Sequence, residues 1–142
     1  MSILQAENLT KIYGDGENAV HALRGIDLTV EKGEFTAIVG TSGSGKSTLL
    51  HMLGGLDRPT TGKVMVDGKD IFTLSEEQLT IFRRRKIGFV FQSYNLVPVL
   101  NLYENIVLPL ELDGKKIDRE YIDQIAETLG IKDRLEALPN QL

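Results

Sequence analysis

The sequence contains no cysteine, which excludes disulfides, thiol chemistry and a cysteine-based zinc site. It also has no run of about 18 apolar residues, the length that a membrane-spanning helix needs. The most apolar stretch, 96–112, is interrupted by prolines and by acidic and amide side chains. The first seven residues carry no basic segment, so we expect no signal peptide. Together these absences predict a cytoplasmic protein.

Basic residues are outnumbered by acidic ones, 16 to 20, which gives a net charge of −4. This balance argues against general binding to nucleic acids or to anionic membranes. The chain has 142 residues, of which 42% are hydrophobic and 25% are charged. Such a composition is typical of a folded domain, and the length predicts a single one.

Strand patterns occupy much of the first 91 residues. A half-buried strand is indicated by apolar residues that alternate with polar ones, namely Ile26, Leu28 and Val30. Segments 35–39 and 87–91 are short apolar runs, and each predicts a buried strand. Asp67 and Gly68 lie between two apolar runs and predict a hairpin turn.

Two helices are expected in the same part of the chain. The first spans 46–53 and has an apolar stripe formed by Leu49, Met52, Leu53 and Leu56. The second begins with a capping box of Ser75 and Gln78 and ends in the basic run 83–86. That basic run is most simply a solvated helix C-terminus, with a phosphate or partner patch as the alternative.

The last part of the chain predicts further helices. Segment 118–130 is amphipathic, and Gly130 would end it. Its expected buried face consists of Tyr121, Ile122, Ile125, Ala126 and Leu129. A short helix over 132–138 should follow and end before Pro139.

The most specific pattern is a phosphate-binding motif between the 35–39 strand and the 46–53 helix. All fixed positions of G-x-x-x-x-G-K-[ST] are filled in the run Gly40, Thr41, Ser42, Gly43, Ser44, Gly45, Lys46 and Ser47. The glycines let successive backbone N–H groups point at one anion, and the helix N-terminus adds partial positive charge. Lys46 would reach the β- and γ-phosphates, the Ser47 hydroxyl suits Mg²⁺, and Thr48 can donate to the α-phosphate. The alternative is a turn that merely joins strand to helix.

A phosphate-binding loop does not select a base, because that choice needs an aromatic or hydrogen-bonding pocket elsewhere. Tyr13 is a candidate stacking platform for such a base. A tyrosine near a strand end is more often a packing residue, and the sequence by itself leaves both interpretations open.

With these features in view, the chain resembles the ATP-binding domain of ABC transporters over nearly its whole length. Tyr13 matches the adenine-stacking aromatic of that family, and Val20 matches an apolar contact beside it. Gln92, after the apolar run 87–91, resembles the Q-loop glutamine, which implies a place near Mg²⁺ and the attacking water. The residues at 83–92 and 95–98 resemble those of one branch of the family, which serves lipoprotein release, macrolide export and antimicrobial-peptide resistance.

The resemblance implies an α/β P-loop NTPase fold of the ABC ATPase type, with an antiparallel β lobe, a helical lobe and an incomplete core sheet. Residues 1–142 would form one truncated ATP-binding domain. Within it, 1–91 would be the nucleotide-binding lobe, and 92–142 the Q-loop and the start of the helical subdomain. The implied ligands are ATP and Mg²⁺. The implied partners are a second copy of the domain and a transmembrane permease that docks near 94–108, which would hold the protein at the inner face of the membrane.

The 142 residues lack the remaining catalytic parts of that family. We find no signature motif, no apolar strand that ends in Asp-Glu, and no switch histidine, because His21 and His51 lie too early in the chain. Phosphoryl transfer depends on such positioning groups. We therefore expect these residues to bind nucleotide at most, without turnover. Because the strand that would pair with 35–39 is missing, we also expect the isolated chain to be marginally stable, to self-associate, or to have the missing strand replaced by another copy. The alternatives are a non-catalytic nucleotide-binding or interaction module and, with less support, another P-loop enzyme such as a kinase or GTPase.

Overall fold

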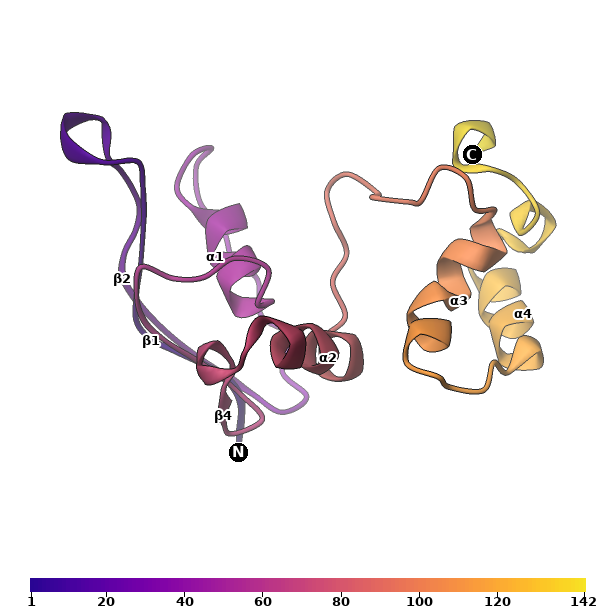
Figure 1. Ribbon diagram of the computed structural model, residues 1–142, viewed down its shortest axis with the longest axis horizontal. Helices are drawn as coiled ribbons and strands as arrows, with labels where there is room; N and C mark the ends of the chain where they lie inside the picture. Colours follow the sequence, from indigo (N-terminus) through magenta and orange to yellow (C-terminus); the bar gives the residue numbers. More distant parts are fainter. The chain divides into compact units, whose positions relative to one another are not determined.

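The computed structural model describes all residues from Met1 to Leu142, in two compact units, Met1–Ile87 and Gly88–Leu142 (Figure 1). The strands are β1 (Ser2–Tyr13), β2 (Val20–Glu31), β3 (Thr61–Val66) and β4 (Lys69–Asp70). The α-helices are α1 (Lys46–Leu53), α2 (Glu76–Lys86), α3 (Leu102–Leu112) and α4 (Arg119–Thr128). Short 3₁₀ turns occupy Gly16–Asn18, Ile71–Thr73, Lys132–Arg134 and Pro139–Gln141. None of the helices has the length and apolar character that a bilayer crossing requires.

The first unit is built on an antiparallel sheet in the order β2-β1-β3-β4. The predicted hairpin is confirmed, because β3 and β4 pair on either side of Asp67 and Gly68. Both turn residues have positive φ, 50° and 75°, which is the requirement of a two-residue turn that follows the strand twist. The strand predicted around Ile26 is likewise confirmed as part of β2.

A bulge in β1 sets which residues of that strand face the core. The pairing with β2 shifts register between Ala6 and Leu9, and Asn8 between them has a φ of 44°. Because of the extra residue, Ala6 and Leu9 are both buried although they are three positions apart. Asp27 on β2 stabilises the bulge, since its carboxylate accepts a 2.7 Å hydrogen bond from the backbone N–H of Asn8.

Helix α1 covers the sheet and closes the core of the first unit (Figure 1). Leu49, Met52 and Leu53 are buried in it, as the helical stripe predicts. Leu56 is not, because the helix ends at Gly54 and the chain turns before it. The capping box at Ser75 that opens α2 is confirmed, and Leu79 of that helix joins the same core.

The two predicted buried strands, 35–39 and 87–91, are wrong for this structure. Neither segment is paired in a ladder, and Phe35, Val39 and Val90 stand almost fully in solvent. A strand requires a neighbour for its N–H and C=O groups, and the four strands of the sheet offer none to these segments. Their composition suits a sheet interior, but composition alone does not provide the partner.

The second unit is helical. Asn101 and Glu104 form a capping box at the start of α3, and the Asn105 side chain ties down the preceding loop through hydrogen bonds to Val97. The amphipathic pattern locates α4 correctly, with Asp118 as its N-cap. However, only Ile122 and Ala126 of the expected face are buried.

The remaining members of the expected α4 face are largely exposed, namely Tyr121, Ile125 and Leu129. The second unit holds only two α-helices and short 3₁₀ turns, of which Lys132–Arg134 contacts α4, and these elements do not cover the whole stripe. The helix expected over 132–138 is a single 3₁₀ turn, Lys132–Arg134.

We predict that the 142-residue chain self-associates through segment 35–39, because an exposed, unpaired apolar run is a template for strand pairing. The double variant Phe35→Lys, Val39→Glu should reduce the association without loss of stability, since these side chains are 97% and 86% exposed. Sedimentation velocity over a range of concentrations measures the effect. Ile38→Lys is the contrasting variant, because Ile38 packs on the core and its loss should unfold the chain. A stable, monodisperse monomer of the unmodified chain would contradict the prediction.

Candidate phosphate-binding site

The loop that precedes α1 has the backbone shape of an anion cradle. Gly43 and Gly45 have φ values of 77° and 91°, which side-chain-bearing residues rarely adopt. At Gly45 there is also no room, because a Cβ there would lie 2.5 Å from the carbonyl oxygen of Ala22. Gly40 is less constrained: its φ is not positive, and the Cβ contact of 2.7 Å would be with Ser44 Oγ, a side-chain atom that can rotate away.

The Lys46 ammonium lies inside this loop. Its Nζ donates hydrogen bonds to the carbonyl oxygens of Gly40 at 2.9 Å and Thr41 at 2.6 Å, and to Ser44 Oγ at 3.3 Å. All three partners are neutral, so no carboxylate in the structure cancels the charge of Lys46. An ammonium that keeps its full charge beside a glycine-rich loop is suited to an anion.

The first turn of α1 faces the same space. Gly45 is the N-cap and has no side chain, so the N–H groups that open the helix receive no side-chain cap. These groups carry the positive end of the helix dipole. Ser47 and Thr48 add hydroxyl groups beside them, which makes donors the dominant polar groups here.

A hollow of about 600 Å³ joins these groups to the start of β2. Its lining consists of Val20, His21, Ala22, Ser42, Gly43, Gly45, Lys46, Ser47 and Thr48. The structure therefore brings Val20 together with the loop, from a part of the chain more than twenty residues earlier. His21 and Ala22 were not expected from the sequence, and only their neighbour Val20 could have indicated them.

Tyr13 lies opposite Val20 in the ladder between β1 and β2, although it does not line the hollow itself. The residue is 42% exposed. The phenol donates a 3.1 Å hydrogen bond to Asp57 Oδ2, and Lys11 Nζ lies over the ring, 4.9 Å from its centroid. The sequence did not indicate that Lys11 and Asp57 contact Tyr13. Lys11 could have been found, because residues two positions apart on a strand lie on the same face. Asp57 could not, because it lies 44 positions away in the sequence.

Asp57 joins these groups into one cluster. Its Oδ1 accepts from Lys11 Nζ at 2.9 Å and from the backbone N–H of Arg58 at 2.8 Å. Burial raises the pKa of the Asp57 carboxyl, but the hydrogen bonds from Lys11, Tyr13 and Arg58 outweigh it, so the pKa lies below its ordinary value of 3.8. At neutral pH the cluster therefore holds one carboxylate and one ammonium that cancel each other.

Gln92 belongs to the second unit, where it is exposed in a bend after the run 87–91. Its neighbours Phe89 and Phe91 contact each other, with ring centroids 4.7 Å apart.

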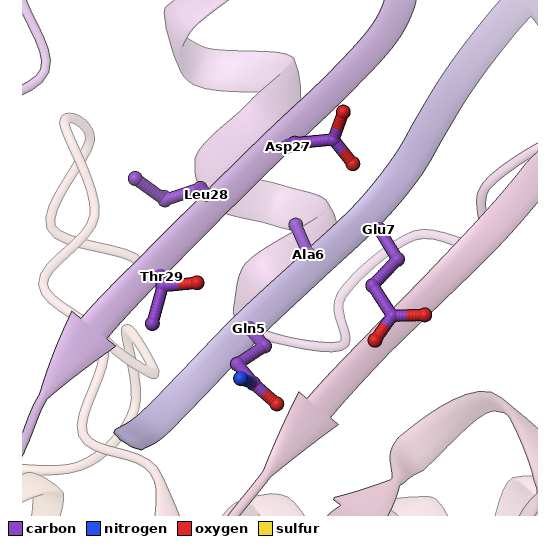
Figure 2. A pocket seen from close by; sticks show the side chains of 6 residues that line it. All are labelled: Gln5, Ala6, Glu7, Asp27, Leu28 and Thr29. Carbon is purple, nitrogen blue, oxygen red and sulfur yellow. The ribbon is translucent and has the colours of Figure 1, made fainter. Parts of the chain in front are cut away.

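Metal-binding clusters of the usual kind are absent. The structure holds no group of three or more His, Cys, Asp or Glu side chains that could bind a metal ion. A second hollow, on β1 and β2, contains the acidic residues Glu7 and Asp27 together with Gln5, Ala6, Leu28 and Thr29 (Figure 2). The Asp27 carboxylate there accepts the hydrogen bond that stabilises the bulge at Asn8, so its place in this hollow is structural.

The lowered pKa of Asp57 predicts a pH-dependent contribution to stability. A carboxyl group whose pKa is lower in the folded state stabilises the fold above its unfolded pKa, and this contribution is lost as the pH falls through the folded pKa. At pH 7 the free energy of unfolding should therefore be larger for the unmodified chain than for Asp57→Asn. The difference between the two should shrink only below about pH 3.8. Urea unfolding of both chains between pH 7 and pH 3 measures it. A difference that does not change with pH would contradict the charged role of Asp57.

Comparison with known proteins identifies the family. The family model described as ABC transporter matches residues 23–142. An ABC transporter ATP-binding protein of Thermotoga maritima is 47% identical over 99% of this chain, and the lipoprotein-releasing system ATP-binding protein LolD of Shewanella frigidimarina is 42% identical over 99%. The chain spans only 61% and 60% of the length of these two relatives.

Solved structures agree with the sequence comparison. The ATP-binding cassette MJ0796, in a dimeric post-hydrolysis state bound to ADP and Pi, matches 98% of this chain with a TM-score of 0.87 and 41% identity. The chain covers 62% of that structure. The expected α/β fold of the ABC ATPase type is thereby confirmed, and the chain belongs to the ABC transporter family.

Proposed function

We propose that this chain is the nucleotide-binding part of an ABC transporter ATPase, which binds MgATP and couples it to export or extraction through a separate permease. The observation that carries the proposal is the Lys46 ammonium, bonded only to neutral oxygens within a loop whose glycines open it to an anion. The family and the ADP-bound relative support the same ligand class.

The groups in the hollow fit a polyphosphate. Lys46 would bind the β- and γ-phosphates, and the backbone N–H groups of 43–48 would donate to the phosphate oxygens. The site has room for such a ligand, because the hollow has a volume of about 600 Å³. Thr41, Ser42 and Ser44 belong to the same loop, and Thr48 would donate its hydroxyl to the α-phosphate.

The base would lie against Tyr13 and Val20. These two residues are cross-strand partners, and they are 42% and 60% exposed respectively. An adenine ring can stack on the tyrosine and contact the valine. This gives the site separate surfaces for the base and for the phosphates.

Mg²⁺ would be held mainly by the nucleotide. Because no carboxylate cluster is present, the contribution of the first unit would be the Ser47 hydroxyl, with phosphate oxygens and water as the other ligands. A role of Gln92 near the ion rests on the family resemblance alone. The ion would neutralise part of the phosphate charge. These are weak, neutral ligands, so we expect Mg²⁺ to bind only together with nucleotide.

Lys46→Ala should strongly weaken the binding of MgATP. The variant removes a charge-assisted contact to the phosphates, and we expect the affinity to fall by more than about tenfold. Isothermal titration calorimetry on the 142-residue chain measures it, with Lys63→Ala on β3 as a control that removes an exposed lysine outside the hollow. Equal affinity of the two variants would contradict the proposal.

These 142 residues should show no ATP turnover above background, because they contain neither a signature motif nor an Asp-Glu pair after an apolar strand. Phosphate release in the presence of excess MgATP measures this, with Lys46→Ala as the blank. Turnover that Lys46→Ala abolishes would show that the chain carries a catalytic group of its own. Binding without turnover is the expected result.

The permease would dock on residues 94–108. Tyr94 and Val99 are largely exposed there, in a segment with few charges. In the protein expressed in its own cells, Tyr94→Asp with Val99→Asp should release it from the membrane fraction and leave MgATP affinity unchanged. Tyr121→Asp, an exposed position on α4, is the matched control and should stay membrane-bound. Retention of the double variant would argue against this docking segment. The second proposed partner is another copy of the domain, which the dimeric relative supports.

A further inference from the structure

The connector between α1 and β3 contacts the end of β1 at the tyrosine assigned to the base. Besides the contacts of Asp57, Lys11 Nζ donates to the carbonyl oxygen of Arg58 at 2.7 Å. The backbone N–H of Ile12 donates to Thr60 Oγ1 at 2.9 Å, and the N–H of Thr60 donates to the carbonyl oxygen of Thr10 at 2.9 Å. The connector thus runs along β1 and fixes its last residues.

Within this contact, Tyr13 is held at two places. Asp57 Oδ2 accepts the hydrogen bond of the phenol, which limits the swing of the ring. The Lys11 ammonium covers the ring at 4.9 Å, and only 14% of the Lys11 side chain is exposed. Asp57 in turn holds Lys11, because Oδ1 accepts from its Nζ at 2.9 Å. One carboxylate therefore controls both contacts to the ring.

We propose that Asp57 and Lys11 are positioning residues that fix the Tyr13 ring for stacking with the base of the nucleotide. Neither residue touches the ligand. They restrict the ring before binding, so that less side-chain freedom is lost when the base stacks. Because their charges cancel, the base meets a rigid aromatic surface with no net charge beside it. This inference rests on the proposed function, since it takes Tyr13 as the surface for the base.

The neighbouring ion pair provides a control within the same connector. Arg58 binds Glu76 of α2 at 2.7 Å and also donates to the carbonyl oxygens of Phe72 and Leu74. Glu76→Ala would loosen the connector from α2 but leave every contact of Tyr13 in place. A residue that acts only through the stability of the connector should behave like Glu76.

The test compares a ligand that has a base with one that has none. ADP and inorganic pyrophosphate are titrated calorimetrically, both with Mg²⁺, into the 142-residue chain and its variants. Asp57→Ala and Lys11→Met should each lower the affinity for ADP by about three- to tenfold, which is the effect of one or two lost hydrogen bonds. Their affinity for pyrophosphate should stay within about twofold of that of the unmodified chain. Asp57→Asn should recover part of the ADP affinity, because its amide oxygen still accepts the phenol hydrogen. Glu76→Ala should change the affinity for neither ligand.

Tyr13→Phe keeps the inference testable if a variant at Asp57 fails to fold. It removes only the phenol oxygen, and it should lower the affinity for ADP but not the affinity for pyrophosphate. Equal losses for ADP and pyrophosphate in Asp57→Ala and Tyr13→Phe, or no loss for either ligand, would overturn the positioning role while the phosphate site stands. If the unmodified chain binds neither ADP nor pyrophosphate, the proposed function is overturned and this inference falls with it.

Discussion

The site depends on one close approach, between Gly45 and the carbonyl oxygen of Ala22. A Cβ at Gly45 would lie only 2.5 Å from that oxygen, so the loop can press against β2 only because residue 45 has no side chain. Through this contact the start of α1, the loop and residues 20–22 line a single hollow. Without it, Lys46 and the first turn of the helix would face solvent, and the strand that carries Val20 would stand apart. The phosphate and base surfaces of the proposed site are therefore joined by a packing constraint rather than by a polar interaction.

A second constraint joins the distant parts of the first unit. The connector after α1 contacts β1 through Asp57 and contacts α2 through Arg58, and Arg83 of α2 donates a 2.7 Å hydrogen bond back to the carbonyl oxygen of Gly55. Two adjacent residues of opposite charge thus bind two different elements. The surface ion pair between Arg58 and Glu76 contributes little by itself, because exposed pairs are typically worth about 0–1 kcal/mol. The value of the arrangement lies in geometry, since it fixes where β1 ends relative to α1.

The sequence was sufficient wherever structure is decided locally. The start of α1 at Lys46, the turn at Asp67 and the cap at Ser75 were predicted correctly, because glycine, Asx and hydroxyl residues act on backbone within a few residues. It failed for 35–39 and 87–91, where a strand needs a neighbour that local sequence does not supply. It also missed the bulge at Asn8, which departs from strict alternation in β1. The partners of Tyr13 were missed for a related reason, as Asp57 approaches from 44 positions away.

Charge explains how the proposed site can separate its two tasks in a chain that is acidic overall. Two lysines lie in the first unit beside the proposed base and phosphate surfaces, and they have opposite surroundings. Lys11 is largely buried, and its charge is neutralised by Asp57 while its ammonium lies over the Tyr13 ring. It is therefore not available to bind an anion. Lys46 is bonded only to carbonyl and hydroxyl oxygens, so its charge remains uncompensated. At the proposed site a polyphosphate would therefore be attracted to Lys46 and not to Lys11, although the net charge of −4 would repel it from most of the surface. The distribution of carboxylates, rather than the number of lysines, would then decide where the phosphates of a nucleotide bind.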